Sequence, residues 1–369
     1  MSSTPKIALV HDRLNVRGGA ERVIEELAGM YPAAPVYTLI YSPEVFSSSA
    51  ISRHPVRSSF INKLPGAANH HRIYIPLMPT AIESFRLDEF DILISSSAAF
   101  AHGIRTRPDQ LHVSYIHSPM RYVWHQYRQH VTQLGYGSVF VKILLAYLRA
   151  WDRKAAKRAD YLVANSHWTA AKIKEAFGRE SVVIYPPVHT ERFRPAKNRS
   201  DYYITVCRLV PYKRVDLMVK AFNRMDLSLV IVGEGPELGK LQKLAEPNVK
   251  IMPFQPQEKL NKLMSEAKGF IYAAEEDFGI AAVEAQTAGC PVIAFGRGGL
   301  TETVVDGVSG LFFDQQSAES IVDAVERFVK VKNKFHTAAI IKNAERFDSA
   351  HFISRFSNHM AGKSGSKSS

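Results

Sequence analysis

The sequence is poor in cysteine and has no long apolar run. Its only two cysteines, Cys207 and Cys290, stand in apolar, strand-like stretches and offer no disulfide framework. This usage favours buried thiols in a reducing compartment. No apolar run reaches the roughly 20 residues that a membrane-spanning helix needs, and the polar leader, residues 1–5, is unlike a signal peptide. We therefore expect a cytoplasmic protein that is soluble or peripheral on a membrane.

Several nucleotide-binding and metal-binding motifs are also missing. The chain has no G-x-G-x-x-G fingerprint and no P-loop lysine motif, so an assignment to nicotinamide enzymes or kinases has no support. No Asp-x-Asp pair follows an expected strand, and no His/Cys cluster has the spacing of metal ligands. We expect chemistry that needs neither a cofactor nor a metal.

What is present fits two α/β domains. The chain has 369 residues, 46% hydrophobic and 22% charged, which is enough for two cores. Strands alternate with helices throughout, a pattern typical of doubly wound parallel sheets. The paired prolines Pro186 and Pro187 mark a connector.

Strands are expected at 6–11, 36–39, 92–95, 113–116, 161–164 and 181–184, and in the second half at 202–208, 227–232, 249–252, 270–273, 292–295 and 311–313. The first helix is expected at 20–30, one at 280–287, and the closing helices at 317–329, 337–346 and 350–360. The tail, residues 362–369, is too polar to fold and is expected to be disordered.

The most informative stretch carries two acidic residues, Glu276 and Glu284, with seven residues between them. Glu276 follows an expected buried strand, and Glu284 lies in the helix after it. In open parallel sheets, ligands bind at the carboxyl ends of the strands. Carboxylates placed there can accept hydrogen bonds from the hydroxyls of a sugar and of a ribose. Solvated helix-end charges are the alternative interpretation.

A net charge of +12 favours an acidic partner, and the surplus is larger in residues 1–180 than in the rest. A basic helix is expected at 138–158, where Lys142, Arg149 and Arg153 would form one stripe beside apolar residues. Such helices lie on anionic membrane surfaces, although an ordinary core helix with a solvated basic face fits as well. No nucleic-acid-binding motif accompanies the charge, so we expect no nucleic acid partner.

The order strand, Glu276, Phe278-Gly279, helix, Glu284, Ala-Gly-Cys-Pro and a second apolar strand resembles the retaining glycosyltransferases of the GT-B fold. Within that fold, the sequence is most similar to the type called glycosyltransferase family 4, or glycosyl transferases group 1. The segment from Tyr115 to Trp124 resembles especially the O-antigen and exopolysaccharide mannosyltransferases. The resemblance implies two Rossmann-like domains across a cleft. Residues 1–187 would bind acceptor and 188–347 the nucleotide sugar, and a helix at 348–361 would return to the first domain.

The resemblance also implies roles for single residues. Arg208 and Lys213 would hold the diphosphate of the leaving nucleotide, and the Gly18-Gly19 turn would lie near the donor phosphate. His117 would contact the donor sugar, with Arg121 on the acceptor side. Glu276 would hold sugar hydroxyls and Glu284 the ribose. Phe278, Gly279 and Ile280 would offer backbone amides to the donor. Apart from the resemblance, the glycines of the run 296–302 are expected to bring backbone amides close to a ligand, and Glu302 to fix the loop. For the basic pair, the glycine turn and the histidine, a chance cluster and purely structural roles are the alternatives.

The expected reaction is transfer of mannose from GDP-mannose to a polyprenyl-diphosphate-linked oligosaccharide at the inner face of the cytoplasmic membrane. This step would belong to the synthesis of lipopolysaccharide O-antigen or an exopolysaccharide. A glucosyl- or galactosyltransferase that uses UDP-sugars is the first alternative, and a sugar-nucleotide epimerase is a second. A non-catalytic basic module for membrane or nucleic acid is the competing class.

Overall fold

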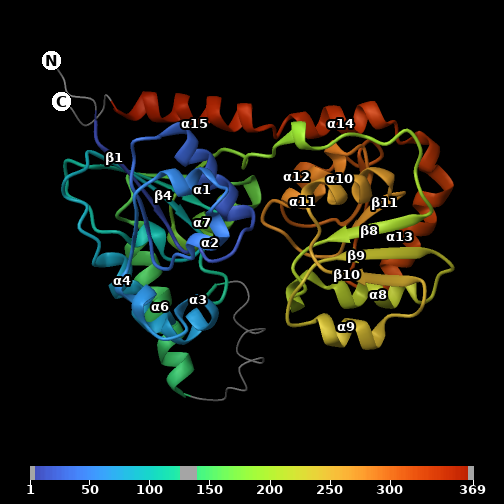
Figure 1. Cartoon of the computed structure of the whole chain (residues 1–369), viewed down its shortest axis with the longest axis horizontal. Coiled ribbons are helices and arrows are strands. Elements are labelled where there is room, and N and C mark those ends of the chain that lie inside the picture. The colour runs from blue at the N-terminus through green and yellow to red at the C-terminus, as the bar shows by residue number, and fades with distance from the viewer. Residues whose placement is uncertain (1–4, 125–138, 365–369) are drawn as a thin grey trace. The chain divides into compact units, whose positions relative to one another are not determined.

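The computed structural model describes residues 5–124 and 139–364. Contacts divide the chain into two compact units: unit 1 is residues 1–187 with 352–369, and unit 2 is residues 188–351. Each unit is a parallel sheet with helices packed on it (Figure 1).

The sheet of unit 1 has seven strands in the order β3-β2-β1-β4-β5-β6-β7, and every neighbouring pair is parallel. Because β1 pairs with β2 on one side and with β4 on the other, the strand order reverses between β1 and β4. The strands are β1 Ile7–His11, β2 Val36–Thr38, β3 Val56–Ser58, β4 Ile92–Ser97, β5 Leu111–Ile116, β6 Tyr161–Ala164 and β7 Val182–Val183.

Helices cover both faces of this sheet because side chains alternate along each strand. Leu9 and Ile94 pack against α1 and α15, whereas Val10 and Leu93 pack against α4 and α6. The helices that cover the sheet are α1 Gly19–Met30, α4 Met78–Glu83, α6 Val139–Ala156, α7 His167–Phe177 and α15 Ser349–Ser364.

Short helical turns, which we did not expect, fill the stretch between β2 and β4. None has the length or the apolar periodicity that marks a helix in the sequence. They are α2 Pro43–Phe46, η1 Ala50–Arg53, η2 Phe60–Lys63, α3 Ala67–His70 and η3 His71–Leu77, followed by α4. The three-residue strand β3 lies in the same stretch and was missed for the same reason. One further turn, η4 Ala101–Gly103, follows β4.

The sheet of unit 2 has six parallel strands in the order β10-β9-β8-β11-β12-β13. The strand order therefore reverses between β8 and β11. The strands are β8 Tyr202–Val206, β9 Ser228–Val232, β10 Val249–Met252, β11 Gly269–Tyr272, β12 Val292–Phe295 and β13 Gly310–Phe313.

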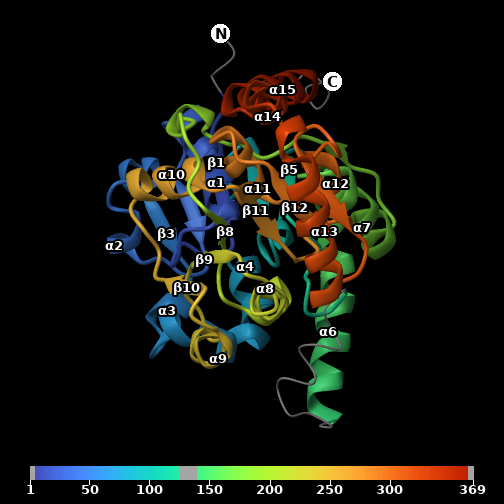
Figure 2. The ribbon, with the colours of Figure 1, turned by 90° about the vertical axis from the view of Figure 1, so that its right-hand side faces the viewer.

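One large apolar core joins this sheet to its helices, and Met218 of α8 and Phe328 of α13 belong to it. Figure 2 shows α13 as a long helix beside the sheet of this unit, where it packs against β12 and β13. The helical segments are η5 Thr190–Arg192, η6 Pro211–Lys213, α8 Val215–Phe222, α9 Leu238–Leu244, α10 Gln257–Glu266, α11 Ile280–Thr287, α12 Leu300–Thr303, α13 Ala318–Val331, η7 Lys332–Lys334 and α14 Thr337–Glu345.

The C-terminal helix extends further than the sequence predicted. α15 reaches Ser364, so residues 362–364 are helical, and the expectation of disorder from 362 onward is wrong for these three. Their last turn is held against unit 1, where the Lys363 ammonium lies 4.3 Å from the centre of the Tyr161 ring. The rest of the expected tail, 365–369, lies outside the described residues.

Candidate active site

The carboxyl edge of the unit 2 sheet brings Lys213 and Glu276 together. Lys213 ends η6, just after β8, and Glu276 follows β11. The Lys213 ammonium bonds the Glu276 carboxylate, and it also donates to the Tyr272 hydroxyl at 2.7 Å. That hydroxyl in turn donates to Glu276 Oε1 at 3.3 Å. Because β8 and β11 are the strands between which the order reverses, the cluster lies where ligands bind in open α/β sheets.

Electrostatics keep this cluster charged. Burial alone would lower the pKa of Lys213, but the Glu276 carboxylate raises it well above its usual value. Burial, with help from Glu276, raises the pKa of Tyr272, so the phenol keeps its proton. The Lys213 ammonium and the Glu276 carboxylate are thus paired with each other in this structure. Each can exchange this partner for a group of a ligand.

Arg208 lies two residues beyond β8 and is not part of this cluster. Its side chain is exposed and bonds to none of the described residues. The glycine loop after β9 fixes its backbone: Leu209 donates to the Glu234 carbonyl at 2.8 Å, and Glu237 donates to the Leu209 carbonyl at 3.1 Å. A side chain on Gly233 would collide with the Cys207 carbonyl, and one on Gly235 with that of Leu209. The glycines therefore allow this loop to support the Arg208 segment.

A second glycine loop supports Glu276. It follows β12 and carries Gly298, which pairs with Glu276 in a parallel bridge, and Gly299, whose amide donates to the Glu276 carbonyl at 2.7 Å. A Cβ atom on Gly299 would overlap the backbone of Asp277 and Phe278. The glycines of this loop were expected to bring backbone amides close to a ligand, but Gly298 and Gly299 lie against the backbone of the Glu276 segment.

The remaining residues of the acidic motif build the helix start. Gly279 has φ +93°, which favours glycine, and it precedes Ile280, the first residue of α11. The Phe278 ring is buried and packs edge-on against Phe347, with 5.3 Å between ring centres. Glu284 lies within α11 and is buried. Its expected role toward a ribose stays a prediction.

In unit 1, the Gly18-Gly19 pair stands at the start of α1. Gly18 caps the helix, which begins at Gly19, one residue earlier than expected. A Cβ atom on Gly18 would lie only 2.9 Å from Glu21 Oε2. The glycine therefore leaves room for the Glu21 carboxylate, and this carboxylate faces His11 at the end of β1.

His117 stands directly after β5 and is connected to that carboxylate. Its Nε2 lies 2.8 Å from Ser96 Oγ, and Ser96 Oγ lies 3.1 Å from His11 Nδ1. His11 Nε2 is 3.7 Å from Glu21 Oε1. Burial, together with the nearby His11 and Arg121, lowers the pKa of His117 to about 4, so the ring is neutral near pH 7.

Sequence reasoning did not assign roles to His11, Ser96, Glu21 or Tyr272. The first three come from different elements, and only the β1-β4-β5 strand order brings them together. The available signals were weak: a Gly-Gly-Ala-Glu turn, and a run of three serines ending an apolar strand. Asp12 is a further buried acid that was not predicted, and its carboxylate accepts hydrogen bonds from the backbone amides of residues 98–101.

The basic stripe predicted on α6 is not present in the form expected. Arg149 donates to the Val123 carbonyl at 3.0 Å, and Arg153 donates to that of Ala176 at 3.0 Å. Both guanidinium groups also lie over the Trp124 ring. These arginines bind α6 to its own unit, because a planar cation stacks on indole and satisfies carbonyl oxygens. The helix was expected to begin at residue 138, which lies outside the described residues.

The exposed surface of α6 is apolar and lysine-bearing instead. Val139 is 66% exposed, Ile143 60% and Tyr147 48%, and Lys142 and Lys154 are exposed as well. In both ribbon views the N-terminal turns of α6 extend beyond the elements on which it packs (Figures 1 and 2). No helix among residues 5–124 and 139–364 is long and apolar enough to cross a membrane.

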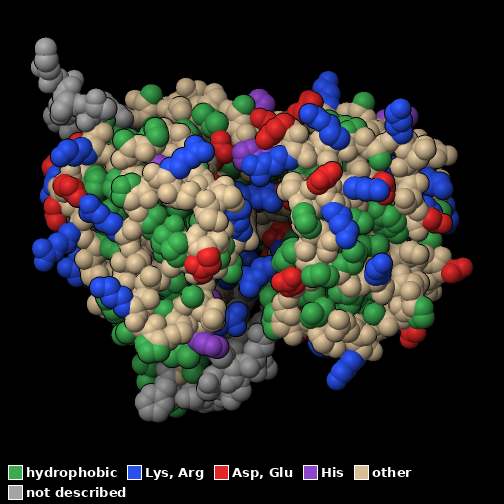
Figure 3. All heavy atoms as spheres, in the orientation of Figure 1, with side chains coloured by type: hydrophobic (Ala, Val, Ile, Leu, Met, Phe, Trp, Pro, Cys, Tyr) green, Lys and Arg blue, Asp and Glu red, His purple; other side chains and the backbone are tan. Residues whose placement is uncertain are grey.

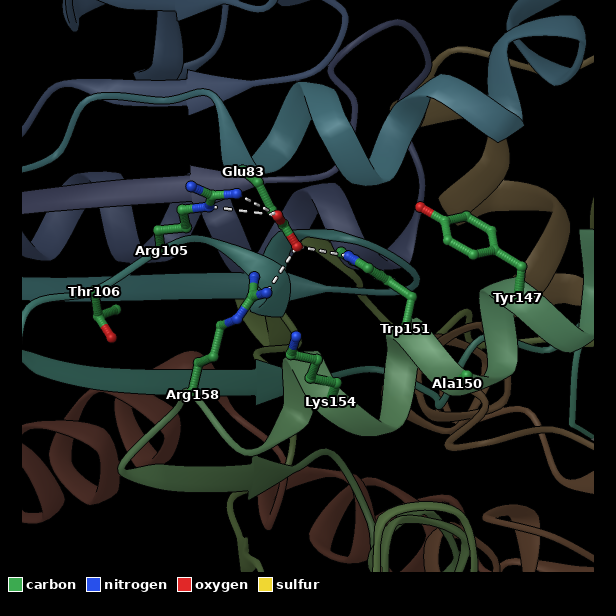
Figure 4. Close-up of a pocket in the computed structure, with 8 residues that line it drawn as sticks. All are labelled: Glu83, Arg105, Thr106, Tyr147, Ala150, Trp151, Lys154 and Arg158. Carbon is green, nitrogen blue, oxygen red and sulfur yellow. Dashed lines mark hydrogen bonds and ion pairs between the residues drawn. The ribbon is translucent and has the colours of Figure 1, made fainter.

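A pocket of about 660 Å³ lies against the same helix. Figure 4 shows Arg105 and Arg158 converging on the Glu83 carboxylate, which also accepts from the Trp151 indole at 2.7 Å. Lys154 lines the pocket, and its ammonium bonds to none of the described residues. Three cations against one carboxylate leave the pocket positive. Its lining is completed by Thr106, Tyr147 and Ala150.

On the face of unit 2 that Figure 3 shows, at the right, Lys and Arg side chains are mixed with Asp and Glu side chains.

Comparisons with known proteins agree with this geometry. Residues 17–192 match the family described as Glycosyltransferase Family 4, and residues 188–347 match Glycosyl transferases group 1. The structure resembles HepE of Anabaena in complex with UDP-glucose, with a TM-score of 0.72 and 20% identity over 97% of this chain and 100% of that one. It also resembles sucrose-phosphate synthase of Thermosynechococcus elongatus, with a TM-score of 0.73 and 16% identity over 97% and 99%.

The two parallel doubly wound sheets thus define the GT-B fold, as predicted. The chain belongs to the glycosyltransferases of the family 4 type, whose two family models together span most of its length. Among its relatives is a GDP-mannose-dependent alpha-(1-6)-phosphatidylinositol monomannoside mannosyltransferase of Mycolicibacterium smegmatis, 31% identical over 214 residues. That match covers 49% of this chain and 56% of the relative, so it spans about half the length of each.

Proposed function

We propose that this chain transfers mannose from GDP-mannose to a lipid-linked oligosaccharide, with retention of the anomeric configuration. The Lys213–Glu276–Tyr272 cluster at the strand-order reversal of unit 2 carries the proposal. The Lys213 ammonium remains charged, and the exposed guanidinium of Arg208 follows the same strand, β8. The two cations together suit a diphosphate, since Arg binds phosphate by a planar fork and Lys as a point charge.

The chemistry follows from the charges. As the bond between the anomeric carbon and the diphosphate breaks, negative charge grows on the leaving phosphate, and Lys213 and Arg208 stabilise it. Glu276, released from Lys213, would accept hydrogen bonds from sugar hydroxyls, and Glu284 from the ribose. The acceptor hydroxyl oxygen forms the new bond to the anomeric carbon, and its proton passes to an oxygen of the departing phosphate. No step requires a metal or a cofactor.

Donor identity has two candidates. The mycobacterial relative depends on GDP-mannose, which favours GDP-mannose for this chain. HepE, which is in complex with UDP-glucose, is less similar in sequence, with 20% identity against 31% for the mycobacterial relative. We expect hydrolysis and transfer from GDP-mannose and little from UDP-glucose, measured as released nucleotide for each donor. Activity with UDP-sugars alone would contradict mannose transfer and would favour a glucosyl- or galactosyltransferase of the same fold. The anomeric configuration of the product, read by NMR, tests retention.

The variant Glu276→Gln tests the site. It preserves shape but removes the charge that holds Lys213, and we expect turnover to fall by about 10²-fold or more. Arg194→Gln, at an exposed position of the same unit, is the matched control and should retain turnover. Undiminished turnover in Glu276→Gln would contradict the assignment of the site. A wild type that is inactive with every sugar nucleotide would instead favour the alternative of a non-catalytic basic module. Activity that disappears with EDTA and returns with Mg²⁺ would overturn metal independence.

The proposed acceptor is a polyprenyl-diphosphate oligosaccharide for O-antigen or exopolysaccharide synthesis, reached from the cytoplasmic face of the membrane. The exposed apolar residues Val139, Ile143 and Tyr147 on α6 support contact with lipid, because their spacing of four residues places them together as one patch on a single helix face. The positive pocket at Lys154 would accept an anionic headgroup beside it.

Vesicle flotation tests this contact. We expect binding to vesicles with anionic phosphatidylglycerol, weakened by salt, and little binding to purely zwitterionic vesicles. Ile143→Ser and Lys154→Gln should each reduce binding several-fold. Val182→Ser, at an exposed position on β7, is the matched control for Ile143→Ser. Binding that ignores lipid charge, salt and both α6 variants would remove the membrane from the proposal.

A further inference from the structure

Four polar side chains form a continuous line from α1 to the end of β5 in unit 1. Glu21 Oε1 lies 3.7 Å from His11 Nε2. Ser96 Oγ lies 3.1 Å from His11 Nδ1 and 2.8 Å from His117 Nε2. His11 is 1% exposed, Ser96 is fully buried and His117 is 8% exposed. With so little access for water, these groups must satisfy one another.

Because Ser96 has a single hydroxyl proton, the hydrogen bonds in this series all run from donor to acceptor in one direction. Ser96 can donate to only one of the two imidazoles, and it accepts from the other. The Glu21 carboxylate favours a proton on the near nitrogen of His11, Nε2. When His11 is neutral, its Nδ1 must therefore accept the hydroxyl proton, and His117 must donate to Ser96 from Nε2.

We propose that Glu21, His11 and Ser96 are positioning residues that set whether Nδ1 of His117 accepts or donates a hydrogen bond. The inference rests on the proposed function only in naming the ligand of that nitrogen, a hydroxyl of the donor sugar. With neutral His11, Nδ1 of His117 has a lone pair that accepts from this hydroxyl.

When His11 takes up one proton from solvent, the donor and acceptor roles in both hydrogen bonds of Ser96 are exchanged. The new proton occupies Nδ1 of His11, which then donates to Ser96 Oγ, and the Ser96 hydroxyl turns to donate to Nε2 of His117. His117 releases its Nε2 proton, carries a proton on Nδ1 instead and stays neutral, while the added charge rests on His11 beside Glu21. His117 would then no longer accept from the sugar hydroxyl. The arrangement thus predicts loss of donor recognition on the acid side.

The charged groups around this line agree with a neutral His117. Asp12 and Arg13 follow β1, Glu21 lies on α1 and Arg121 follows β5, and all four act on the two imidazoles or on Glu21. Burial would raise the pKa of Glu21, but His11 lowers it below its usual value, so the carboxylate stays ionised. Burial, with help from His11, lowers the pKa of His117 to about 4, so this ring stays mostly uncharged above pH 5.

A substitution at Gly18 can separate Glu21 from His11 without changing either residue. A methyl group there would lie 2.9 Å from Glu21 Oε2, and the flexible carboxylate can move aside. Gly18→Ala therefore displaces Glu21 from His11 while the fold is kept. Gly29→Ala is the matched control on the same helix, because a Cβ atom at Gly29 meets no atom within 4 Å.

The first experiment is ¹⁵N NMR of the ligand-free, ¹⁵N-histidine-labelled full chain between pH 8 and pH 4.5. The variants His11→Gln and His117→Gln identify the signals. We expect His117 to change from the Nε2–H to the Nδ1–H tautomer at the pH where His11 gains charge, and this coupling to disappear in Ser96→Ala. A His117 tautomer that stays the same while His11 titrates, or a His11 that gains no proton above pH 4.5, overturns the inference.

The second experiment is the pH profile of kcat/KM for the sugar nucleotide that proves to be the donor. Glu21→Gln and Gly18→Ala should both move the acid limb to lower pH, by about one unit, because His11 loses its stabilising anion. Gly29→Ala should leave the limb in place. An unmoved limb in both test variants contradicts the inference. The NMR experiment needs no turnover. A wild type that is inactive with every donor would therefore refute the proposed function, while the NMR signals of His11 and His117 would still test the inference.

Discussion

At the scale of single residues, the candidate site depends on charges that are partnered before any ligand arrives. Lys213 and Glu276 were expected from the sequence because each follows an apolar strand at a motif-like spacing. Tyr272 was not expected, since a tyrosine at a strand end is ordinary and only the β8-β11 pairing places its hydroxyl beside both. Residue type and spacing can predict which groups do chemistry, but the groups that orient them come from strands distant in sequence.

Buried histidines give a prediction for stability. Burial lowers the pKa of His112 to about 3, and the pKa of His117 is about 4. Because an unfolded histidine titrates near 6.5, the unfolded chain binds more protons below that pH, and the free energy of unfolding falls as pH drops from about 6.5 toward 4. At pH 5 each histidine would contribute on the order of 2 kcal/mol to this loss.

Tryptophan fluorescence measures this loss for unit 1 alone, because all three tryptophans, Trp124, Trp151 and Trp168, lie within it. The melting temperature should fall between pH 7 and pH 5, and His112→Gln should make the fall less steep. The exposed His70→Gln serves as the control and should follow the wild type. An equally steep fall in His112→Gln would contradict the burial argument.

At the scale of elements, long periodic helices and buried strands were predictable, and short turns were not. α13 and α14 follow apolar periodicity and were expected within a few residues of their bounds. The turns from α2 to α3 have no such periodicity and are defined by local capping, as where Ser49 and Ser59 accept from amides two residues later. On α6 the sequence showed basic residues at helical spacing, but it could not show that Trp124 would cover two of them.

The glycine loops of unit 2 provide a prediction at this scale. Gly299→Ala places a methyl group against the backbone of Asp277 and Phe278, where no flexible side chain can move away. We expect a loss of stability of about 1–3 kcal/mol for overpacking of this kind and increased hydrogen exchange in the Glu276 segment. Gly239→Ala on α9, where a Cβ atom meets nothing within 4 Å, is the matched control. Unchanged exchange around Glu276 in Gly299→Ala would show that the loop does not support the site.

At the scale of the whole molecule, the two units repeat one arrangement. In each sheet the strand order reverses beside the first strand, between β1 and β4 in unit 1 and between β8 and β11 in unit 2. Each reversal brings polar side chains together: His11 and Ser96 in the first, Lys213 and Glu276 in the second. The alternation of strands and helices predicted the doubly wound class, but strand order follows from long-range pairing, which a single sequence does not encode in local pattern.

The most direct test of the account is calorimetric titration of sugar nucleotides into the full chain, since its central claim is that Lys213 in unit 2 receives a diphosphate. We expect GDP-mannose and GDP to bind the wild type, and Lys213→Gln to weaken both by at least tenfold. Lys259→Gln, at an exposed position on α10, should bind like the wild type. Equal affinity in Lys213→Gln and the wild type, or no binding of any sugar nucleotide to the wild type, would contradict the account.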